Sequence, residues 1–370
     1  MTAAAQLPLD PIAGAPGAPA EDRWVAVARD VAERLAPDAA ARELAAAPPV
    51  VEAALFREAG LLSLIASEKL GGHGRPYSVA MAVVRQLARV DSGLARLLAY
   101  HYAFSNRQAS DLLSAERYRD FERRAVEQRW HVASTGTPLG EELTLIGSAA
   151  RGYRLNGTKH FATGACVADR IIGFVADPDS GERLLVEIDP ARPQVAFLDD
   201  WDVIGERLSA SNGLVITDYA LSAEEIIGSL GHDDVPREPH RTLAVLSFQL
   251  VFVHLLLGTA EGALITARDY TRAKTRPWIH SDVDDATEDP HILATYGDLV
   301  SRVQGLAALA ARAERAAAWA LARGTRLTAH ERTVSQRRHG LQRTVDQCST
   351  EITRRYREGE ARVDDLLLGG

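Results

Sequence analysis

The run 243–267 limits the possible folds of this chain more than any other stretch. It is rich in leucine, valine and alanine, but it also contains Gln249, His254 and Glu261. These polar residues leave no uninterrupted apolar span of bilayer length. In a soluble protein, a helix that is apolar nearly all round is buried among other elements. We therefore expect a buried central helix over 241–273.

Helical patterns also occupy the N-terminal third and the region after the central helix. Residues 1–20 are mostly Ala, Pro and Gly with almost no charge, which is typical of a disordered tail. Apolar residues at helical spacing predict helices over 21–35, 49–59 and 79–98. A further helix over 290–322 carries small residues every three or four positions, which suits close helix packing.

The middle of the chain has the pattern of strands. Short apolar segments follow one another without a helix between them, so we expect a mainly antiparallel sheet. The predicted fold class is α+β. The expected parts are a disordered tail (1–20), an N-terminal helical domain (21–128), a middle antiparallel β domain (129–228), a C-terminal helical bundle (229–330) that is incomplete, and an atypical tail (331–370).

Charge and cysteine content exclude several classes of function. The formal net charge of −8 argues against a binder of nucleic acid or of anionic membranes, because both need a basic surface. Cys166 and Cys348 are far apart and in no metal-ligand spacing, which predicts a reducing, cytoplasmic environment and no metal site. The N-terminus lacks the basic and apolar regions of a secretory signal.

The stretch 153–165 carries the first candidate site. Asn156-Gly157 is a strong signal for a two-residue hairpin turn, and it predicts a second strand over 158–163. Side chains alternate along a strand, so Phe161 and Thr163 should share one face. An aromatic ring beside a hydroxyl suits a flat heteroaromatic ligand. The alternative is an ordinary hairpin on a half-buried sheet.

Four motifs together resemble a known family. Gly157-Thr-Lys, followed by Phe161-Ala-Thr163, is similar to the flavin-contacting strand of the acyl-CoA dehydrogenase superfamily. It is most similar to the branch of reduced-flavin (FMNH2) monooxygenases that includes dibenzothiophene monooxygenase. Further matches are Ala133 with Thr135, the Asp-Trp201 segment with its serine-rich turn, and Tyr-Thr-Arg272 with Arg276-Pro-Trp. The resemblance implies an acyl-CoA dehydrogenase-like fold and covers most of the chain from about residue 52 to 328.

The resemblance also implies roles for single residues. Phe161 and Trp201 would flank the flavin ring or the substrate, and Thr163 and Thr135 would bond the ring edge. The implied catalytic residues are His101, Thr163 and Trp201, and the implied cofactor-binding residues are Thr135, Phe161, Thr163, Trp201, Arg272 and Arg276. His101 would assist oxygen chemistry or proton transfer. Arg272 or Arg276 would grip the flavin phosphate, which in this family is bound by one subunit while the ring sits with another.

Each of these roles has a plainer alternative. His101 could be a core histidine whose hydrogen bonds are all made within the protein. Trp201 could be buried between sheet and helix, and the arginine segment could be a solvated basic run. Val132 and Gly136 depart from the family pattern, and from about residue 331 the pattern fails altogether. The family's C-terminal histidine and the carboxylate base of the dehydrogenases have no counterpart.

The function implied by the resemblance is an FMNH2-dependent monooxygenase that oxidises a small sulfur-containing or aromatic substrate with O2. A separate NAD(P)H-flavin reductase would supply the reduced cofactor, and the chain would form a homo-oligomer, either a tetramer or a dimer. Two alternatives stay open. One is an acyl-CoA dehydrogenase that uses FAD, and the other is an inactive, truncated homologue that binds no flavin. Neither nucleic acid nor a membrane is an expected partner.

Overall fold

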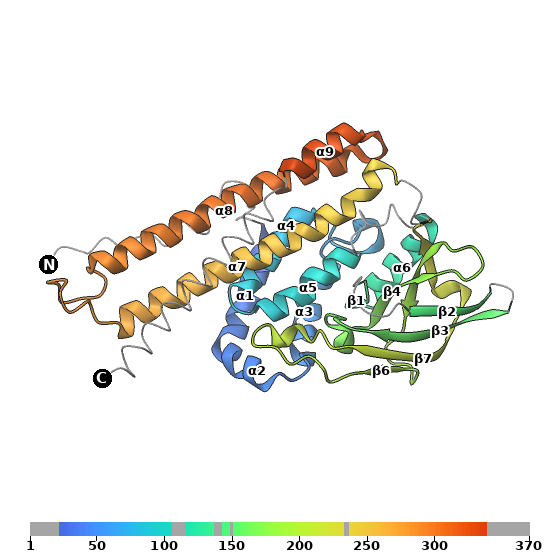
Figure 1. Ribbon diagram of the computed structural model, residues 1–370, viewed down its shortest axis with the longest axis horizontal. Coiled ribbons are helices and arrows are strands. Elements are labelled where there is room, and N and C mark those ends of the chain that lie inside the picture. The colour runs from blue at the N-terminus through green and yellow to red at the C-terminus, as the bar shows by residue number, and fades with distance from the viewer. Residues whose placement is uncertain (1–21, 106–114, 137–142, 149–150, 233–236, 339–370) are drawn as a thin grey trace.

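The structure, a computed structural model, describes residues 22–105, 115–136, 143–148, 151–232 and 237–338 (Figure 1). Six helices come first: α1 (Arg23–Leu35), α2 (Ala39–Ala45), α3 (Val50–Glu58), α4 (Tyr77–Ala88), α5 (Ser92–Ser105) and α6 (Ala115–Glu127). A sheet follows, and then α7 (Leu243–Lys274), α8 (Pro290–Arg323) and α9 (Ala329–Arg338). The expected tail 1–20 lies outside the described residues, and so does 339–370 of the expected tail 331–370, whose first residues belong to α9.

The sheet is mainly antiparallel. Its strands are β1 (Val132–Ser134), β2 (Leu143–Ser148), β3 (Gly152–Lys159), β4 (Arg170–Ala176), β5 (Arg183–Ile188), β6 (Val195–Phe197), β7 (Leu214–Leu221) and β8 (Ile226–Ser229). Their order is β6-β7-β3-β2-β4-β5-β8, and β1 pairs with β4. The β1–β4 and β2–β4 pairings are parallel and the other pairings are antiparallel, so the expectation of a mainly antiparallel sheet is confirmed.

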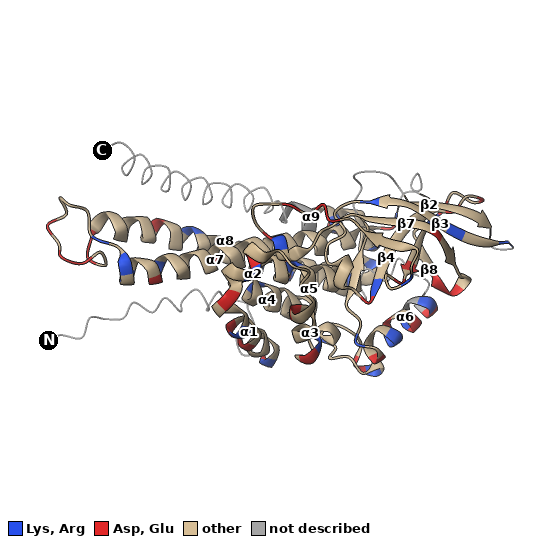
Figure 2. Ribbon diagram, turned by 90° about the horizontal axis from the view of Figure 1, so that it is seen from below, with Lys and Arg blue, Asp and Glu red and all other residues tan. Residues whose placement is uncertain are grey.

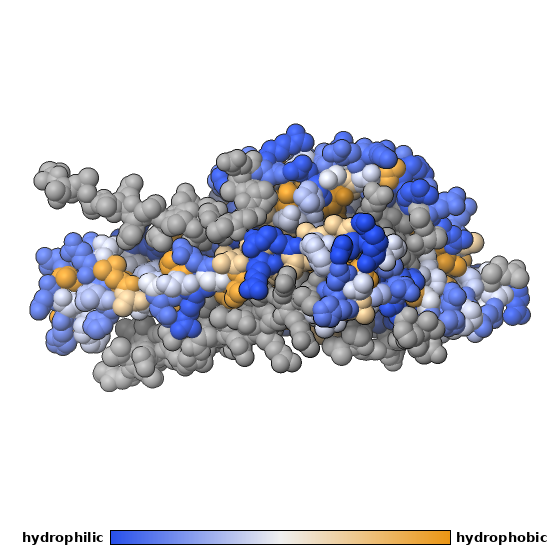
Figure 3. Space-filling model, turned by 90° about the horizontal axis from the view of Figure 1, so that it is seen from above, coloured by the Kyte–Doolittle hydropathy of each residue, from blue (hydrophilic) through white to orange (hydrophobic). Residues whose placement is uncertain are grey.

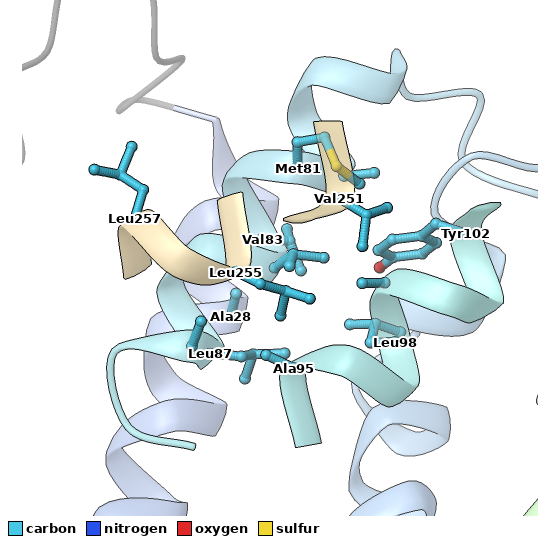
Figure 4. Packing of buried hydrophobic residues seen from close by; sticks show 14 of the residues in the cluster. Ala28, Met81, Val83, Leu87, Ala95, Leu98, Tyr102, Val251, Leu255 and Leu257 are labelled. Carbon is cyan, nitrogen blue, oxygen red and sulfur yellow. The ribbon is translucent and has the colours of Figure 1, made fainter. Parts of the chain in front are cut away.

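The main core surrounds α7, as the apolar run predicts. Met81 and Leu87 of α4, Leu98 of α5 and Val251 and Leu255 of α7 are all buried there (Figure 4). The helix is long and apolar enough to cross a membrane, with a mean hydropathy of 2.0. It packs against α4, α5 and α8, and 56% of its most apolar stretch is buried, as expected of a core helix.

Helices α4 and α7 touch backbone to backbone. A Cβ at Gly262 would lie 2.0 Å from the Arg89 carbonyl oxygen, so only glycine permits this approach. Beside it, the fully buried carboxylate of Glu261 accepts from the guanidinium groups of Arg85 and Arg89. This network stands at the crossing and joins the N-terminal helices to the C-terminal ones.

The far ends of α7 and α8 project from the body as a helical hairpin (Figures 1 and 2). The sheet lies at the opposite end of the molecule. Several large apolar side chains are exposed on or near this hairpin, among them Tyr270, Trp278, Ile279 and Leu293. Apolar surface alternates with polar surface along it in Figure 3.

The predicted hairpin at Asn156-Gly157 is wrong. Both residues lie inside the continuous strand β3, which pairs with β2 on one side and β7 on the other. The two ladders outweigh the local turn preference, and the irregularity is absorbed as a register shift next to Gly157. Asn156 instead accepts from the backbone N–H of Asp218 through its side-chain oxygen, at 2.7 Å.

The single helix predicted over 79–98 is also wrong, because α4 ends at Ala88 and α5 begins at Ser92. The side chain of Asp91 accepts from the backbone N–H of Leu94 at 2.9 Å and caps the new helix. Tyr100, Tyr102 and Phe104 therefore lie within the last turns of α5.

Candidate functional site

Phe161 stands in a turn that follows β3 and not on a strand face. Its φ of 59° is left-handed, which is unusual for a bulky residue. Its ring is 53% exposed, whereas Thr163 two residues later is buried. The predicted alternation is therefore wrong here, because the strand ends at Lys159. Backbone strain of this kind collects at functional sites.

The segment 198–213, between β6 and β7, brings Trp201 to Phe161. The two ring centroids are 6.2 Å apart with an interplanar angle of 87°. This edge-to-face contact makes a corner and leaves no ring-wide gap, so a flat ligand could lie on a face of one ring beside the other. The indole N–H of Trp201 donates to the Glu206 carbonyl at 3.2 Å, which fixes its orientation.

A chain of three buried hydroxyls adjoins the corner. The Thr163 hydroxyl lies 2.9 Å from the Ser211 hydroxyl, which lies 2.9 Å from that of Ser209. The sequence argument quoted the serine-rich turn as a motif but gave these serines no role. The signal that could have found them is their position between Trp201 and β7.

Thr135 presents a buried polar atom without a partner. It lies just after β1, with its backbone N–H donating to the Ile172 carbonyl at 3.0 Å. The side chain is 2% exposed, and its hydroxyl has no hydrogen-bond partner in the part of the chain that the structure describes. A buried hydroxyl without a partner is costly, so this site fits a ligand that carries hydrogen-bonding groups.

His101 lies in the core between α5 and β1. Its Nδ1 accepts from the backbone N–H of Val132 at 3.0 Å, and its Nε2 donates to the Leu62 carbonyl at 2.8 Å. Burial, together with the charge of neighbouring His131, lowers the pKa of His101 to about 3. A neutral ring with both nitrogens engaged favours a structural role over the predicted proton transfer, which stays a prediction.

Arg272 and Arg276 lie far from the other candidate residues. Arg272 is in the last turn of α7 and Arg276 follows the helix, and both are exposed. They stand where the α7–α8 hairpin projects away from the sheet (Figure 1). Within one chain, therefore, the structure groups Phe161, Thr163 and Trp201 but separates them from the two arginines.

A cluster of half-buried aromatic rings joins α5 to α7. The Phe248 ring lies 5.1 Å from Tyr100, 5.7 Å from Phe104 and 5.6 Å from Phe252. The sequence argument gave no role to the two rings on α7, where a period of four residues was the available signal. Within the described ranges, no group of three or more His, Cys, Asp or Glu side chains could hold a metal ion.

Comparison with known proteins agrees with this architecture. Residues 20–111 match the N-terminal domain of acyl-CoA dehydrogenases. Dibenzothiophene monooxygenase from Rhodococcus qingshengii is 31% identical over 85% of this chain and 78% of its own. The probable FMNH2-dependent monooxygenase SfnC from Pseudomonas putida is 30% identical, over 86% of this chain and 82% of its own.

A solved structure supports the same relationship. FMN-bound TdsC from Paenibacillus sp. A11-2 superposes with a TM-score of 0.79 at 28% identity, covering 89% of this chain and 84% of that one. The predicted resemblance and fold class are confirmed by these matches, and so is the predicted enzyme class. The chain belongs to the flavin-dependent monooxygenases of the acyl-CoA dehydrogenase fold, the family that includes dibenzothiophene monooxygenase.

Proposed function

We propose that the chain is an FMNH2-dependent monooxygenase that oxidises a small sulfur-containing or aromatic compound with O2. The observation that carries the proposal is the corner of Phe161 and Trp201 beside the buried Thr163 hydroxyl. A strained, exposed aromatic side chain has little structural use, but it suits the face of a flat cofactor. When bound, reduced FMN supplies the electrons that activate oxygen.

The residues present fit such a cofactor. The unpartnered hydroxyl of Thr135 and the hydroxyl of Thr163 can bond the polar edge of the ring system, which carries carbonyl and nitrogen groups. The aromatic cluster on α5 and α7 supplies an apolar wall for a substrate of the proposed class. The proton-transfer role of His101 is not part of this proposal.

The phosphate of the cofactor would be bound by a second copy of the chain. Arg272 and Arg276 can grip a phosphate, but they stand at the projecting end of the α7–α8 hairpin, away from the sheet and from the segments that form the ring site. We therefore propose a homo-oligomer, a dimer or a tetramer, in which the hairpin of one copy serves the ring site of another. The exposed side chains of Trp278 and Ile279 suit an interface there. A separate NAD(P)H-flavin reductase is the proposed partner, and the cytoplasm is the proposed location.

The first test is an anaerobic titration of the purified chain with FMN and FAD, each oxidised and then reduced. The reduced complex is then mixed with oxygenated buffer and a panel of small sulfides and aromatic compounds. The oxygen is isotope-labelled O2, and the products are analysed by mass spectrometry. The proposal expects tighter binding of reduced FMN and one labelled oxygen atom in a product. Tight FAD binding with acyl-CoA-dependent dye reduction would instead identify a dehydrogenase. Failure to bind flavin in either state would identify an inactive homologue.

A matched variant separates binding from folding. Thr135→Val removes a hydroxyl that has no partner in the described chain, so the free energy of unfolding should stay equal or rise. The same change should weaken the binding of reduced FMN by about tenfold, because a hydrogen bond to the ring edge is lost. Unchanged FMN affinity in this variant would remove Thr135 from the proposed site.

A further inference from the structure

The ring-binding corner is made from two segments that are distant in sequence. Phe161 belongs to the turn after β3, and Trp201 belongs to the segment between β6 and β7. The distance between the two rings therefore depends on how these segments are joined. Neither segment is held by a regular strand ladder at the aromatic residue itself.

Asn212 lies near the end of the Trp201 segment and bonds both to the turn of Phe161 and to Trp201 itself. Its backbone carbonyl accepts from the N–H of Ala162, next to Phe161, at 3.1 Å. Its side-chain oxygen accepts from the backbone N–H of Trp201, also at 3.1 Å. Trp201 is thus fixed at two points, because its indole N–H is bonded to Glu206 as well.

The neighbours of Asn212 reinforce the same link. Asp200 accepts from the backbone N–H of Gly213 at 2.7 Å and lies 3.1 Å from the Nδ1 of His160. A Cβ at Gly213 would lie 2.8 Å from Asp200 and 2.9 Å from His160, so the three groups are in close contact. His160 precedes Phe161 and Asp200 precedes Trp201. Phe161 is therefore flanked on both sides by residues that bond the Trp201 segment, and Trp201 is flanked on one side by a residue that bonds the Phe161 turn.

Backbone strain gives this arrangement a reason. Besides Phe161, Glu206 and Ala210 have left-handed φ angles of 60° and 43°. Non-glycine residues keep such angles only where surrounding contacts hold them. A network that only stabilised the fold would not need three strained residues around one aromatic pair. A preformed binding site needs such strained residues to be held in place by hydrogen bonds before the ligand arrives. If the site became ordered only on binding, the entropy cost would weaken the affinity.

We propose that Asn212 is a positioning residue of the ring site. Its side chain holds Trp201 against Phe161, so that the corner exists before the flavin binds. The inference rests on the proposed function, because it takes the bound ring to lie in this corner. Asn212 itself need not touch the cofactor. Its side chain also hydrogen-bonds the Cys166 thiol, but its effect on flavin binding should pass through the indole of Trp201.

The test is a double-mutant cycle in which the affinity for reduced FMN is measured by anaerobic titration of the full-length chain. Asn212→Leu removes the side-chain oxygen at similar volume and should weaken binding by about tenfold. Asn212→Asp keeps an oxygen acceptor and should restore most of the affinity. In a Trp201→Ala background, Asn212→Leu should change the affinity by less than about twofold, because the residue it positions is gone.

The outcomes separate the two proposals. If the parent chain binds reduced FMN and Asn212→Leu binds it equally well, the positioning role is wrong while the proposed function stands. An equal loss in both backgrounds also overturns the role, because it shows a general structural effect. If the parent chain does not bind reduced FMN, both proposals fall. If the leucine variant does not fold, Asn212→Ala, which adds no bulk, is compared with the parent chain in the same two backgrounds.

Discussion

Replacing Phe161 by glycine and by alanine should separate strain from function. Both changes remove the ring, so they share the loss of the contact with Trp201. They differ in backbone preference, because at a φ of 59° glycine is unstrained and alanine is not. The comparison between the two variants therefore isolates the strain stored at this position.

The left-handed region costs a residue with a Cβ about 1–2 kcal/mol. The free energy of unfolding of Phe161→Gly should thus exceed that of Phe161→Ala by about 1 kcal/mol, and its melting temperature should be about 2 °C higher. Since 53% of the phenylalanine side chain is exposed, its removal forfeits little burial. Both variants should bind reduced FMN at least about tenfold more weakly than the parent, because the stacking face is lost.

Urea denaturation followed by circular dichroism measures the first effect, and anaerobic titration measures the second. Thr217 is a matched control: it is exposed in β7 and has no left-handed angle. There the order should reverse, with glycine less stable than alanine by about 0.5–1 kcal/mol. If Phe161→Ala proves as stable as Phe161→Gly, the backbone is not left-handed in solution and the strain argument fails.

Three further predictions follow from the structure. Arg276→Gln should weaken FMN binding by about 10- to 100-fold but leave the binding of riboflavin, which lacks the phosphate, unchanged. The control variant Arg315→Gln on α8 should change the affinity for neither ligand. Equal losses of affinity for FMN and riboflavin in a titration of Arg276→Gln would contradict phosphate binding. Glu261→Gln should lower the free energy of unfolding in urea by about 3–5 kcal/mol, because Arg85 is left buried without a counter-charge. His101 has a pKa of about 3 when folded and 6.5 otherwise, so stability should fall by about 1.4 kcal/mol per unit as pH drops from 6.5 toward 3. The slope of melting temperature against pH should be shallower in His101→Gln, and an unchanged slope would contradict this assignment.

Sequence patterns predicted the long elements well, because their signals span many residues. The apolar run gave the central helix within two residues at either end. These elements are buried on most sides, so hydrophobic periodicity and burial agree. At Asn156 the signal covered only two residues. Pairing with strands on both sides of β3 overrode it, and such pairing depends on segments far away in sequence.

The candidate site was predictable as a set of residues but not as a geometry. The motifs pointed to Phe161, Thr163 and Trp201, and the structure does bring these three together. Their contact depends on a left-handed turn at Phe161 and on bonds from Asn212, neither of which leaves a local pattern. For His101 the same limit applies, since only the fold shows that its two nitrogens are already bonded to backbone groups.

The helices of the N-terminal region take part in the ring site as well as in the core. The segment that carries Trp201 rests on α5, where a Cβ at Gly93 would lie 2.9 Å from the Ser209 nitrogen. On the other side, the carboxylate of Glu43 in α2 accepts from a backbone N–H of the same segment at 3.0 Å. These contacts adjoin the strained Glu206, whose carbonyl holds the indole. Because strained residues keep their angles only under such constraint, we expect changes in α2 or α5 to shift Trp201 through this segment, and so to alter the proposed flavin site without touching it.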